Sequence, residues 1–163
     1  MFSYKIVMVG DFGVGKTSLV RRFVDNSFSE EYLSSIGVCI SKKNINDSLI
    51  MLWDIEGKTE LKPIFNQYLN GAKGFIVVGD VTRISTIESI SKHIQLCQQS
   101  SPDAPIIVSL NKKDIKADTI YSKDKIKKLS SNIILVIETS AKSGDGVSDI
   151  FSKLDSKIVE QMQ

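Results

Sequence analysis

The chain has 163 residues and a mass of 18.1 kDa, which allows one domain with a sizeable buried core. Apolar residues make up 42% and charged residues 25%, as in an ordinary soluble globular protein. The formal net charge of +2 excludes the large basic excess typical of nucleic-acid binders, so no nucleic-acid partner is expected.

Short apolar runs alternate with helical patterns along the chain. The strand candidates are residues 4–10, 37–45, 49–54, 74–80, 106–111 and 133–138. The helix candidates are residues 16–25, 62–71, 86–99, 122–129 and 147–161. Nearly continuous apolar strands with helices between them predict a mostly parallel sheet with helices on both faces.

Two details complete this prediction. Only residues 46–48 separate the second and third strand candidates, too few for a crossover, so these strands are expected to form an antiparallel hairpin. The last helix candidate has one apolar face that predicts core packing, made of Val147, Ile150, Phe151, Leu154, Ile158 and Met162. The sequence therefore predicts one α/β domain over residues 1–163. Its sheet has six mostly parallel strands with one antiparallel edge strand, and about five helices cover it.

Residues 10–17, Gly-Asp-Phe-Gly-Val-Gly-Lys-Thr, match the P-loop pattern GxxxxGK[ST]. They follow a strand candidate and open a helix candidate, so backbone N–H groups and the helix N-terminus can point at phosphate oxygens. The pattern predicts that Lys16 reaches the β- and γ-phosphates and that the Thr17 hydroxyl ligates Mg²⁺. The predicted phosphate-binding residues are Gly13, Val14, Gly15, Lys16, Thr17 and Ser18.

Two later segments select the base. Residues 111–114, Asn-Lys-Lys-Asp, follow a strand candidate, and the Asp114 carboxylate can accept two hydrogen bonds from guanine. Adenine offers no such pair of donors. Residues 138–142 follow the last strand candidate, and the backbone N–H of Ala141 is placed to donate to the guanine O6. With the P-loop, these segments predict a guanine nucleotide as the ligand.

With these motifs in this order, the chain resembles a small GTPase of the Ras superfamily, and residues 35–38, 52–54 and 68–72 resemble segments of the Rab branch. The resemblance covers essentially the whole chain and implies the six-stranded G-domain fold. It implies a switch that binds GTP or GDP, with roles in signalling and vesicle trafficking. The residues that it places around guanine are Phe28, Asn111, Lys112, Asp114, Ser140, Ala141 and Lys142.

A nucleotide switch needs loops that contact the γ-phosphate and relax when it leaves, and residues 26–37 are the first candidate. Family members carry Thr where Ser35 stands, with its hydroxyl on Mg²⁺ and its backbone N–H on the γ-phosphate. Ser35 keeps the hydroxyl and lacks the methyl group, so a functional ligand in a looser loop is expected. Ser34 is an alternative to Ser35 as this ligand if the alignment with the family shifts by one residue.

The second candidate is residues 54–58, which match the family pattern DxxG. The resemblance implies that Asp54 holds Mg²⁺ through water and that the Gly57 N–H meets the γ-phosphate. Lys58 replaces the usual Gln and has only donors, so it cannot accept a hydrogen bond from the attacking water. Glu56 stands beside the γ-phosphate where relatives carry Ala. It forms an inert pair with Lys58, replaces the missing water acceptor, or weakens the preference for a triphosphate.

The arginines predict slow hydrolysis without a partner. Arg21 and Arg22 lie on the first helix candidate, and Arg83 follows the fourth strand candidate, away from the expected site. No arginine finger within the chain is therefore expected. Such a cation is worth roughly 10³–10⁵ in rate for this class of reaction.

Two functions remain open. The first is a switch that binds GTP with Mg²⁺ and hydrolyses it slowly, with residues 30–40 and 54–70 contacting effector, exchange-factor and activating proteins. The second is a hydrolysis-deficient, nucleotide-locked module that serves as a protein-interaction scaffold. An ATP-using enzyme would require both base motifs to be accidental. The aromatic triad of Rab proteins corresponds to Ile40, Trp53 and Tyr68, where Ile40 departs from the pattern and Trp53 is equally explained as a core residue.

We expect a cytoplasmic monomer with no direct membrane anchor in this chain. Cys39 and Cys97 form no CxxC pair, which indicates reduced cysteines of an intracellular protein. No signal peptide precedes the first strand candidate, and residues 160–163 offer no cysteine for prenylation. Peripheral attachment through a partner or a missing tail stays open. The lysines of residues 112–128 form a solvated face or a patch for an anionic membrane.

Overall fold

The computed structural model describes residues 1–26, 28, 37–55 and 65–163. The strands are β1 (Phe2–Gly10), β2 (Val38–Ile45), β3 (Ser48–Ile55), β4 (Ala72–Asp80), β5 (Ile106–Asn111) and β6 (Ile133–Glu138). The helices of these described residues are α1 (Lys16–Asp25), α2 (Phe65–Leu69), α3 (Ile84–Glu88), α4 (Ile90–Ser100), α5 (Lys123–Lys127) and α6 (Val147–Met162). None of them is long and apolar enough to cross a membrane.

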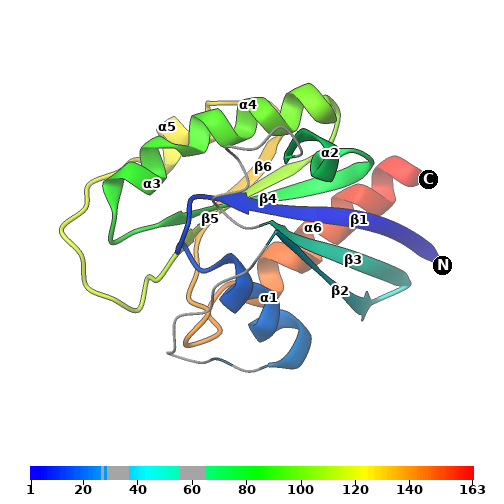
Figure 1. Cartoon of the computed structure of the whole chain (residues 1–163), viewed down its shortest axis with the longest axis horizontal. Coiled ribbons are helices and arrows are strands. Elements are labelled where there is room, and N and C mark those ends of the chain that lie inside the picture. The colour runs from blue at the N-terminus through cyan, green and yellow to red at the C-terminus, as the bar shows by residue number, and fades with distance from the viewer. Residues whose placement is uncertain (27, 29–36, 56–64) are drawn as a thin grey trace.

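The strands form one sheet in the order β2-β3-β1-β4-β5-β6 (Figure 1). The edge strand β2 pairs antiparallel with β3, and every other neighbouring pair is parallel. The predicted six-stranded, mostly parallel sheet with one antiparallel edge strand is therefore confirmed.

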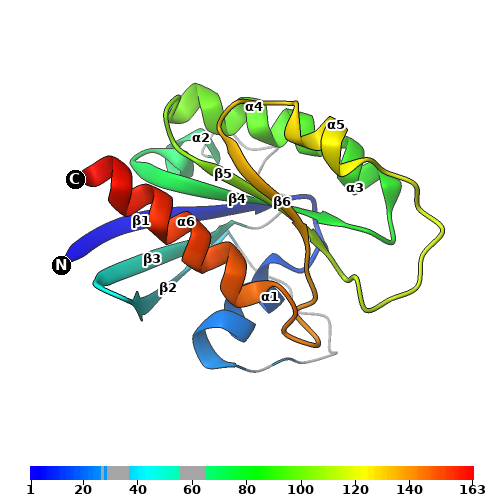
Figure 2. The ribbon, with the colours of Figure 1, turned by 180° about the vertical axis from the view of Figure 1, so that it is seen from behind.

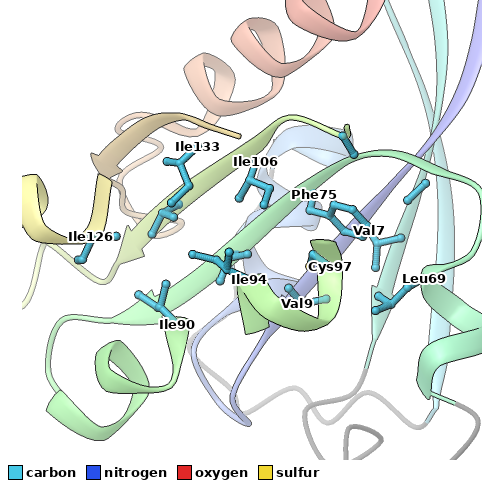
Figure 3. Packing of buried hydrophobic residues seen from close by; sticks show 14 of the residues in the cluster. Val7, Val9, Leu69, Phe75, Ile90, Ile94, Cys97, Ile106, Ile126 and Ile133 are labelled. Carbon is cyan, nitrogen blue, oxygen red and sulfur yellow. The ribbon is translucent and has the colours of Figure 1, made fainter. Parts of the chain in front are cut away.

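Helices cover both faces of the sheet. Figures 1 and 2 show α1 and α6 on one face, and α2, α3, α4 and α5 on the other. Alternate side chains of β1 pack against the helices on the two faces of the sheet, because successive side chains of a strand point to opposite faces. Val7 and Val9 join the core under α4, which Figure 3 shows, whereas Ile6 and Met8 pack toward α1 and α6.

Two helix predictions need correction. The predicted helix 86–99 is divided at Ser89 into α3 and α4, and the Ser89 hydroxyl donates to the Ser85 carbonyl at 2.9 Å. Such a bond to the preceding turn competes with the helical pattern and bends helices. In α6, Met162 is 40% exposed and not part of the core. The core contacts of α6 end at Ile158 and Val159, one turn earlier.

The parallel strands bring the important loops together. The carboxyl ends of β1, β4, β5 and β6 meet at one edge of the sheet, so residues 10–15, 80–83, 111–114 and 139–142 converge there. Ligands of open α/β sheets bind at this edge.

Candidate functional site

The P-loop connects β1 to α1, and its backbone requires glycine. Gly15 has a φ of 102° and precedes the first residue of α1. A Cβ atom on Gly15 would lie 2.3 Å from Asn111 Nδ2, so any side chain there would displace Asn111. The loop after β5 therefore packs directly against the P-loop.

Lys16 is buried inside the P-loop, with 6% of the residue exposed. Its ammonium donates to the carbonyls of Gly10 at 2.6 Å and Asp11 at 3.2 Å. These bonds hold the charge at the place where the pattern predicts phosphate binding.

Thr17 and Asp54 are brought together from the start of α1 and the end of β3. The Thr17 hydroxyl donates to the Asp54 carboxylate, which is 3% exposed. A hydroxyl beside a buried carboxylate is a hard-oxygen donor set that suits Mg²⁺. These are two of the three predicted metal ligands. The third, Ser35, lies outside the described residues.

Asn111 joins three loops, and only 1% of it is exposed. Its amide nitrogen donates to the Val14 carbonyl at 3.0 Å. Its oxygen accepts from the Thr139 hydroxyl at 3.2 Å and from the Ala141 backbone N–H at 3.3 Å. The P-loop and the two loops predicted to read the base, residues 111–114 and 139–142, are therefore held as one unit.

The predicted base-reading carboxylate lies beside the 139–142 loop. Asp114 Oδ1 accepts a hydrogen bond from the Ser140 hydroxyl at 2.7 Å. The Ser140 oxygen in turn accepts from the Ser143 backbone N–H at 3.0 Å. Within the described part of the chain no residue bonds to Asp114 Oδ2, so this oxygen remains able to accept from a base.

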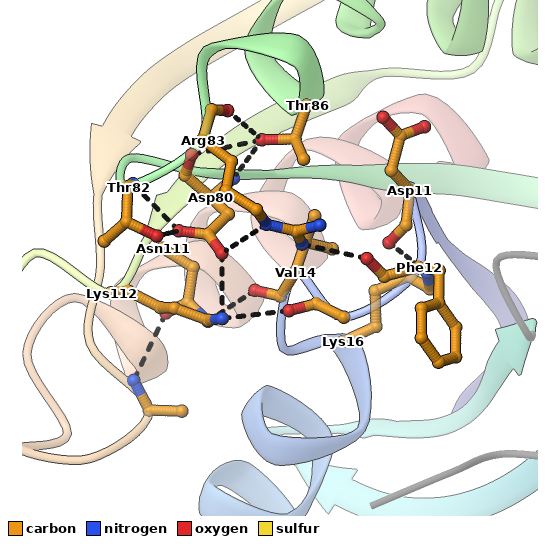
Figure 4. A network of polar contacts seen from close by, with 12 residues as sticks. Asp11, Phe12, Val14, Lys16, Asp80, Thr82, Arg83, Thr86, Asn111 and Lys112 are labelled. Atoms are coloured by element: carbon orange, nitrogen blue, oxygen red, sulfur yellow. Dashed lines mark hydrogen bonds and ion pairs between the residues drawn. The ribbon is translucent and has the colours of Figure 1, made fainter. Parts of the chain in front are cut away.

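Asp80, at the end of β4, holds two cations against the P-loop (Figure 4). Its Oδ2 accepts from Lys112 Nζ at 2.8 Å and from Arg83 Nε at 3.1 Å. Lys112 Nζ also donates to the Gly13 carbonyl at 2.9 Å. Burial alone would raise the pKa of Asp80, but hydrogen bonds from Lys112 and Thr82 outweigh it and hold the pKa below its ordinary value.

The prediction that Arg83 lies away from the site is wrong. Its guanidinium donates to the Phe12 carbonyl of the P-loop at 2.8 Å. Thr82 donates through its backbone N–H and its hydroxyl to Asp80 Oδ1, at 2.9 and 2.6 Å, and this turn folds the chain back over the P-loop. Arg83 contacts the carbonyl side of the loop, which is opposite to the side predicted to bind phosphate.

A buried histidine also reaches the P-loop. His93 of α4 is 1% exposed, and its Nε2 lies 2.9 Å from Asp11 Oδ1. Burial lowers the pKa of His93, the Asp11 carboxylate opposes this effect, and the nearby Lys16 and Lys92 charges add to it. The net pKa is below the ordinary value of histidine, so the ring is neutral at pH 7.

Comparison with known proteins shows the family. Residues 5–160 match the Ras family. The chain belongs to the Ras family of small GTPases. It is similar to Rab-1C of Dictyostelium discoideum, with 35% identity over 94% of this chain and 80% of the relative. Rab-12 of Mus musculus is 32% identical over 99% of this chain and 69% of the relative. SEC4 of Candida albicans is 31% identical over 96% of this chain and 78% of the relative.

In this Ras-family chain, Arg22 is a further site residue that no motif indicated. From α1 it donates to the carbonyl of Ala141 through Nε at 2.8 Å and to the carbonyl of Lys142 through a terminal nitrogen at 2.6 Å. Arg22 thereby braces the loop whose Ala141 N–H is expected to meet guanine. These two carbonyls lie more than a hundred residues away along the chain, so no local pattern could reveal the contact.

The predicted effector face of this Ras-family chain is partly described. Ile40 pairs with Trp53 across the β2–β3 hairpin and is 48% exposed. The Trp53 and Tyr68 rings lie 6.4 Å apart, and Lys5 Nζ sits 3.6 Å from the centre of the Trp53 ring. The three residues predicted as a triad therefore lie on one face of the sheet.

The remaining predicted residues fall at the switches. Phe28 is half-buried and packs against the core under α1 and α6. Glu56, Gly57 and Lys58, like Ser35, lie outside the described residues. Their roles in hydrolysis therefore stay predictions.

Proposed function

We propose that this chain is a guanine-nucleotide switch that binds GTP or GDP with Mg²⁺ and slowly hydrolyses GTP to GDP and phosphate. The observation that supports this most is the Asn111 brace. It ties the P-loop at Val14 to the base-reading loop at Ala141 through hydrogen bonds of 3.0 and 3.3 Å. A nucleotide that spans both loops would bind phosphate and base in one rigid unit.

The described residues suit the parts of a nucleoside triphosphate. Lys16 would neutralise the β- and γ-phosphates from inside the P-loop. Thr17 and Asp54 would hold Mg²⁺, which supplies positive charge to the phosphate oxygens when bound. Asp114 would accept from the guanine ring N–H and amine. The Ala141 N–H, which lies 3.3 Å from Asn111 Oδ1, would share its hydrogen bond between that oxygen and the guanine O6. Guanine specificity then depends on an acceptor and a donor held side by side.

Hydrolysis would depend on Glu56, Gly57 and Lys58 of the second switch candidate. Catalysis in this reaction class consists mainly of positioning and charge stabilisation, with water as the nucleophile. Lys58 cannot accept a hydrogen bond from that water, so the intrinsic rate should be very low. Glu56 would be a substitute acceptor, an inert partner of Lys58, or a group that disfavours the γ-phosphate. A scaffold that binds nucleotide and never hydrolyses it is the competing function.

Partner recognition would use residues 30–40 and 54–70, together with the exposed Ile40 beside Trp53. The relatives named above are Rab proteins and SEC4, so the proposed setting is signalling in vesicle trafficking. Effector, exchange-factor and activating proteins are the expected partners. Because Ile40 replaces an aromatic residue of the Rab triad, we expect its effectors to differ from those of other Rab proteins.

The test is single-turnover hydrolysis of Mg²⁺-GTP by the wild type, by Lys58→Gln and by Lys116→Gln. The last variant makes the same change at an exposed lysine outside the site. A positioned acceptor for the attacking water is worth roughly 10²–10⁴ in rate in favourable cases. We therefore expect Lys58→Gln to be at least about tenfold faster than the wild type and Lys116→Gln to match the wild type.

Each result decides between functions. Equal rates in all three proteins would show that Lys58 does not face the attacking water. Tight binding of GTP without phosphate release, even with Lys58→Gln, would favour the scaffold. Failure of the wild type to bind GTP or GDP in preference to ATP would refute the proposal.

A further inference from the structure

Every backbone carbonyl from Gly10 to Val14 accepts a hydrogen bond from a side chain. Lys16 donates to the Gly10 and Asp11 carbonyls at 2.6 and 3.2 Å. The next three carbonyls, of Phe12, Gly13 and Val14, accept in turn from Arg83 at 2.8 Å, Lys112 at 2.9 Å and Asn111 at 3.0 Å. Figure 4 labels the donors Lys16, Arg83, Lys112 and Asn111 together with the acceptors Asp11, Phe12 and Val14. Lys16, Lys112 and Asn111 belong to sequence motifs, whereas Arg83 belongs to none.

A carbonyl held in place also fixes the next N–H. The peptide group is planar, and in a trans peptide the C=O and the following N–H point in opposite directions. No described peptide bond is cis. The bond from Arg83 to the Phe12 carbonyl therefore turns the Gly13 N–H away from Arg83 and toward the inside of the loop, where the phosphates are expected.

Arg83 is itself held in position. Its Nε bonds to Asp80 Oδ2 at 3.1 Å, and Asp80 is 1% exposed. One terminal nitrogen of Arg83 would lie 3.3 Å from a Cβ atom on Gly13, so the guanidinium lies directly against the outside of the loop. Asp80 also bonds to Lys112, which holds the next carbonyl. One buried carboxylate thus orders the donors for two consecutive P-loop peptides.

We propose that Arg83 is a positioning residue of the P-loop, which presents the Gly13 N–H to the β-phosphate of a bound guanine nucleotide. This inference rests on the proposed nucleotide binding. Arg83 touches neither phosphate nor base in this role and acts through the Phe12–Gly13 peptide. Its loss should therefore weaken binding of nucleotides that have a β-phosphate and leave the binding of a monophosphate unchanged.

The experiment compares the affinities for GDP and GMP, in the presence of Mg²⁺, of the wild type, Arg83→Met, Arg83→Gln, Arg83→Lys and Arg21→Met. The Met side chain keeps an apolar stem and removes the donors. Arg21 is exposed on α1, so Arg21→Met is a control with the same change of charge. A hydrogen bond from a charged donor is worth a factor of roughly ten to one hundred in an equilibrium constant. Because the Arg83 side chain is 43% exposed, the lower end applies.

We expect about a tenfold loss of GDP affinity in Arg83→Met and Arg83→Gln, with GMP affinity unchanged and the Arg21→Met control like the wild type. Arg83→Lys keeps the charge and should recover part of the loss. The ³¹P resonance of the β-phosphorus of bound GDP should shift in Arg83→Met and not in the control. If Arg83→Met does not fold, Arg83→Gln provides the same comparison.

Two results would overturn the inference while nucleotide binding stands. One is GDP affinity equal to that of the wild type in the folded Arg83 variants. The other is a loss of GMP affinity as large as that of GDP affinity, which would indicate general loosening of the site. A wild type that binds neither nucleotide would instead refute the proposed function.

Discussion

Replacing Asp80 with Asn should destabilise the folded protein, because this one carboxylate accepts four hydrogen bonds. Oδ1 accepts from the backbone N–H and hydroxyl of Thr82, and Oδ2 accepts from Arg83 and Lys112. Asparagine has one oxygen, so its NH₂ group must face one of these pairs. Arg83 and Lys112 have only donors, so neither can bond to that NH₂ group. In the opposite orientation the NH₂ group would meet the Thr82 backbone N–H, which is also only a donor, and both cations would face a neutral oxygen.

The size of the destabilisation can be estimated from the two hydrogen bonds that Asp80 accepts from Arg83 and Lys112. Each hydrogen bond with a charged group contributes about 1.5–3 kcal/mol, so losing both would cost about 3–6 kcal/mol if the cations stayed dry. The side chains of Arg83 and Lys112 are 43% and 32% exposed, so water replaces part of what they lose. With that discount, we expect the free energy of unfolding to fall by about 2–3 kcal/mol.

Urea unfolding of the nucleotide-free protein measures this loss, with the midpoint lowered and the slope unchanged. Asp118→Asn is the matched control, because Asp118 is exposed and forms no hydrogen bond with any described residue. A difference of less than about 0.5 kcal/mol between the two variants, which is the usual range for surface substitutions, would refute the reasoning.

The pH dependence of stability provides a second test of the hydrogen bonds to Asp80. The pKa of Asp80 is held below its ordinary value in the folded protein. Its stabilisation is therefore fully present above the ordinary pKa of about 3.9 and is lost as the pH falls through the lower folded-state value. The gap between the wild type and Asp80→Asn should narrow below about pH 4.

Two further predictions concern other buried polar groups. The chain has one histidine, and burial holds the pKa of His93 below the ordinary histidine value of about 6.5. The unfolded state therefore binds the extra proton first as the pH falls. The free energy of unfolding should therefore fall as the pH drops below about 6.5, by at most about 1.4 kcal/mol per pH unit. Urea unfolding of the wild type and of His93→Gln measures this, and the contribution of His93 to the pH dependence should be absent in the variant. Tyr4→Phe should cost about 1–3 kcal/mol, because it leaves the buried Asp155 carboxylate without the Tyr4 hydroxyl. Tyr4 lies at the end of β1 opposite to the P-loop, so the GDP affinity of Tyr4→Phe should equal that of the wild type. A slower or faster release of GDP by the variant would contradict the view that Tyr4 affects stability alone.

The fold was predictable because its main features are local patterns. Parallel strands buried on both faces are nearly continuous apolar runs, and the three-residue gap between the second and third strand candidates permits only a hairpin, which β2 and β3 form. The break at Ser89 was not predictable from periodicity, because a hydroxyl bond to the Ser85 carbonyl leaves the apolar pattern unchanged. Periodicity likewise placed Met162 on the apolar face of α6 without indicating that the core contacts end at Val159.

The candidate site was predictable where a motif lies at the end of a strand. The parallel order of β1, β4 and β5 brings their following loops to one edge, which is why Asn111 reaches Val14. The contact of Thr17 with Asp54 also follows from the neighbouring strands β1 and β3. Arg83 was placed wrongly because its position after β4 gives no sign that Asp80 bonds to Thr82 and turns the chain back toward the P-loop.

The residues that the sequence missed share a chemical reason. Arg83 and Arg22 bond to backbone carbonyls, of Phe12 and of Ala141 and Lys142, and every residue type carries a carbonyl. A side chain that bonds to a backbone carbonyl therefore does not require a particular residue type at the position it contacts. No sequence pattern can then predict which two residues are in contact. A motif residue faces a ligand of fixed chemistry, and its type and spacing are constrained together. In this protein the groups expected to face the nucleotide were visible in the sequence, whereas Arg83 and Arg22, which contact only the backbone of these loops, emerged only from the fold.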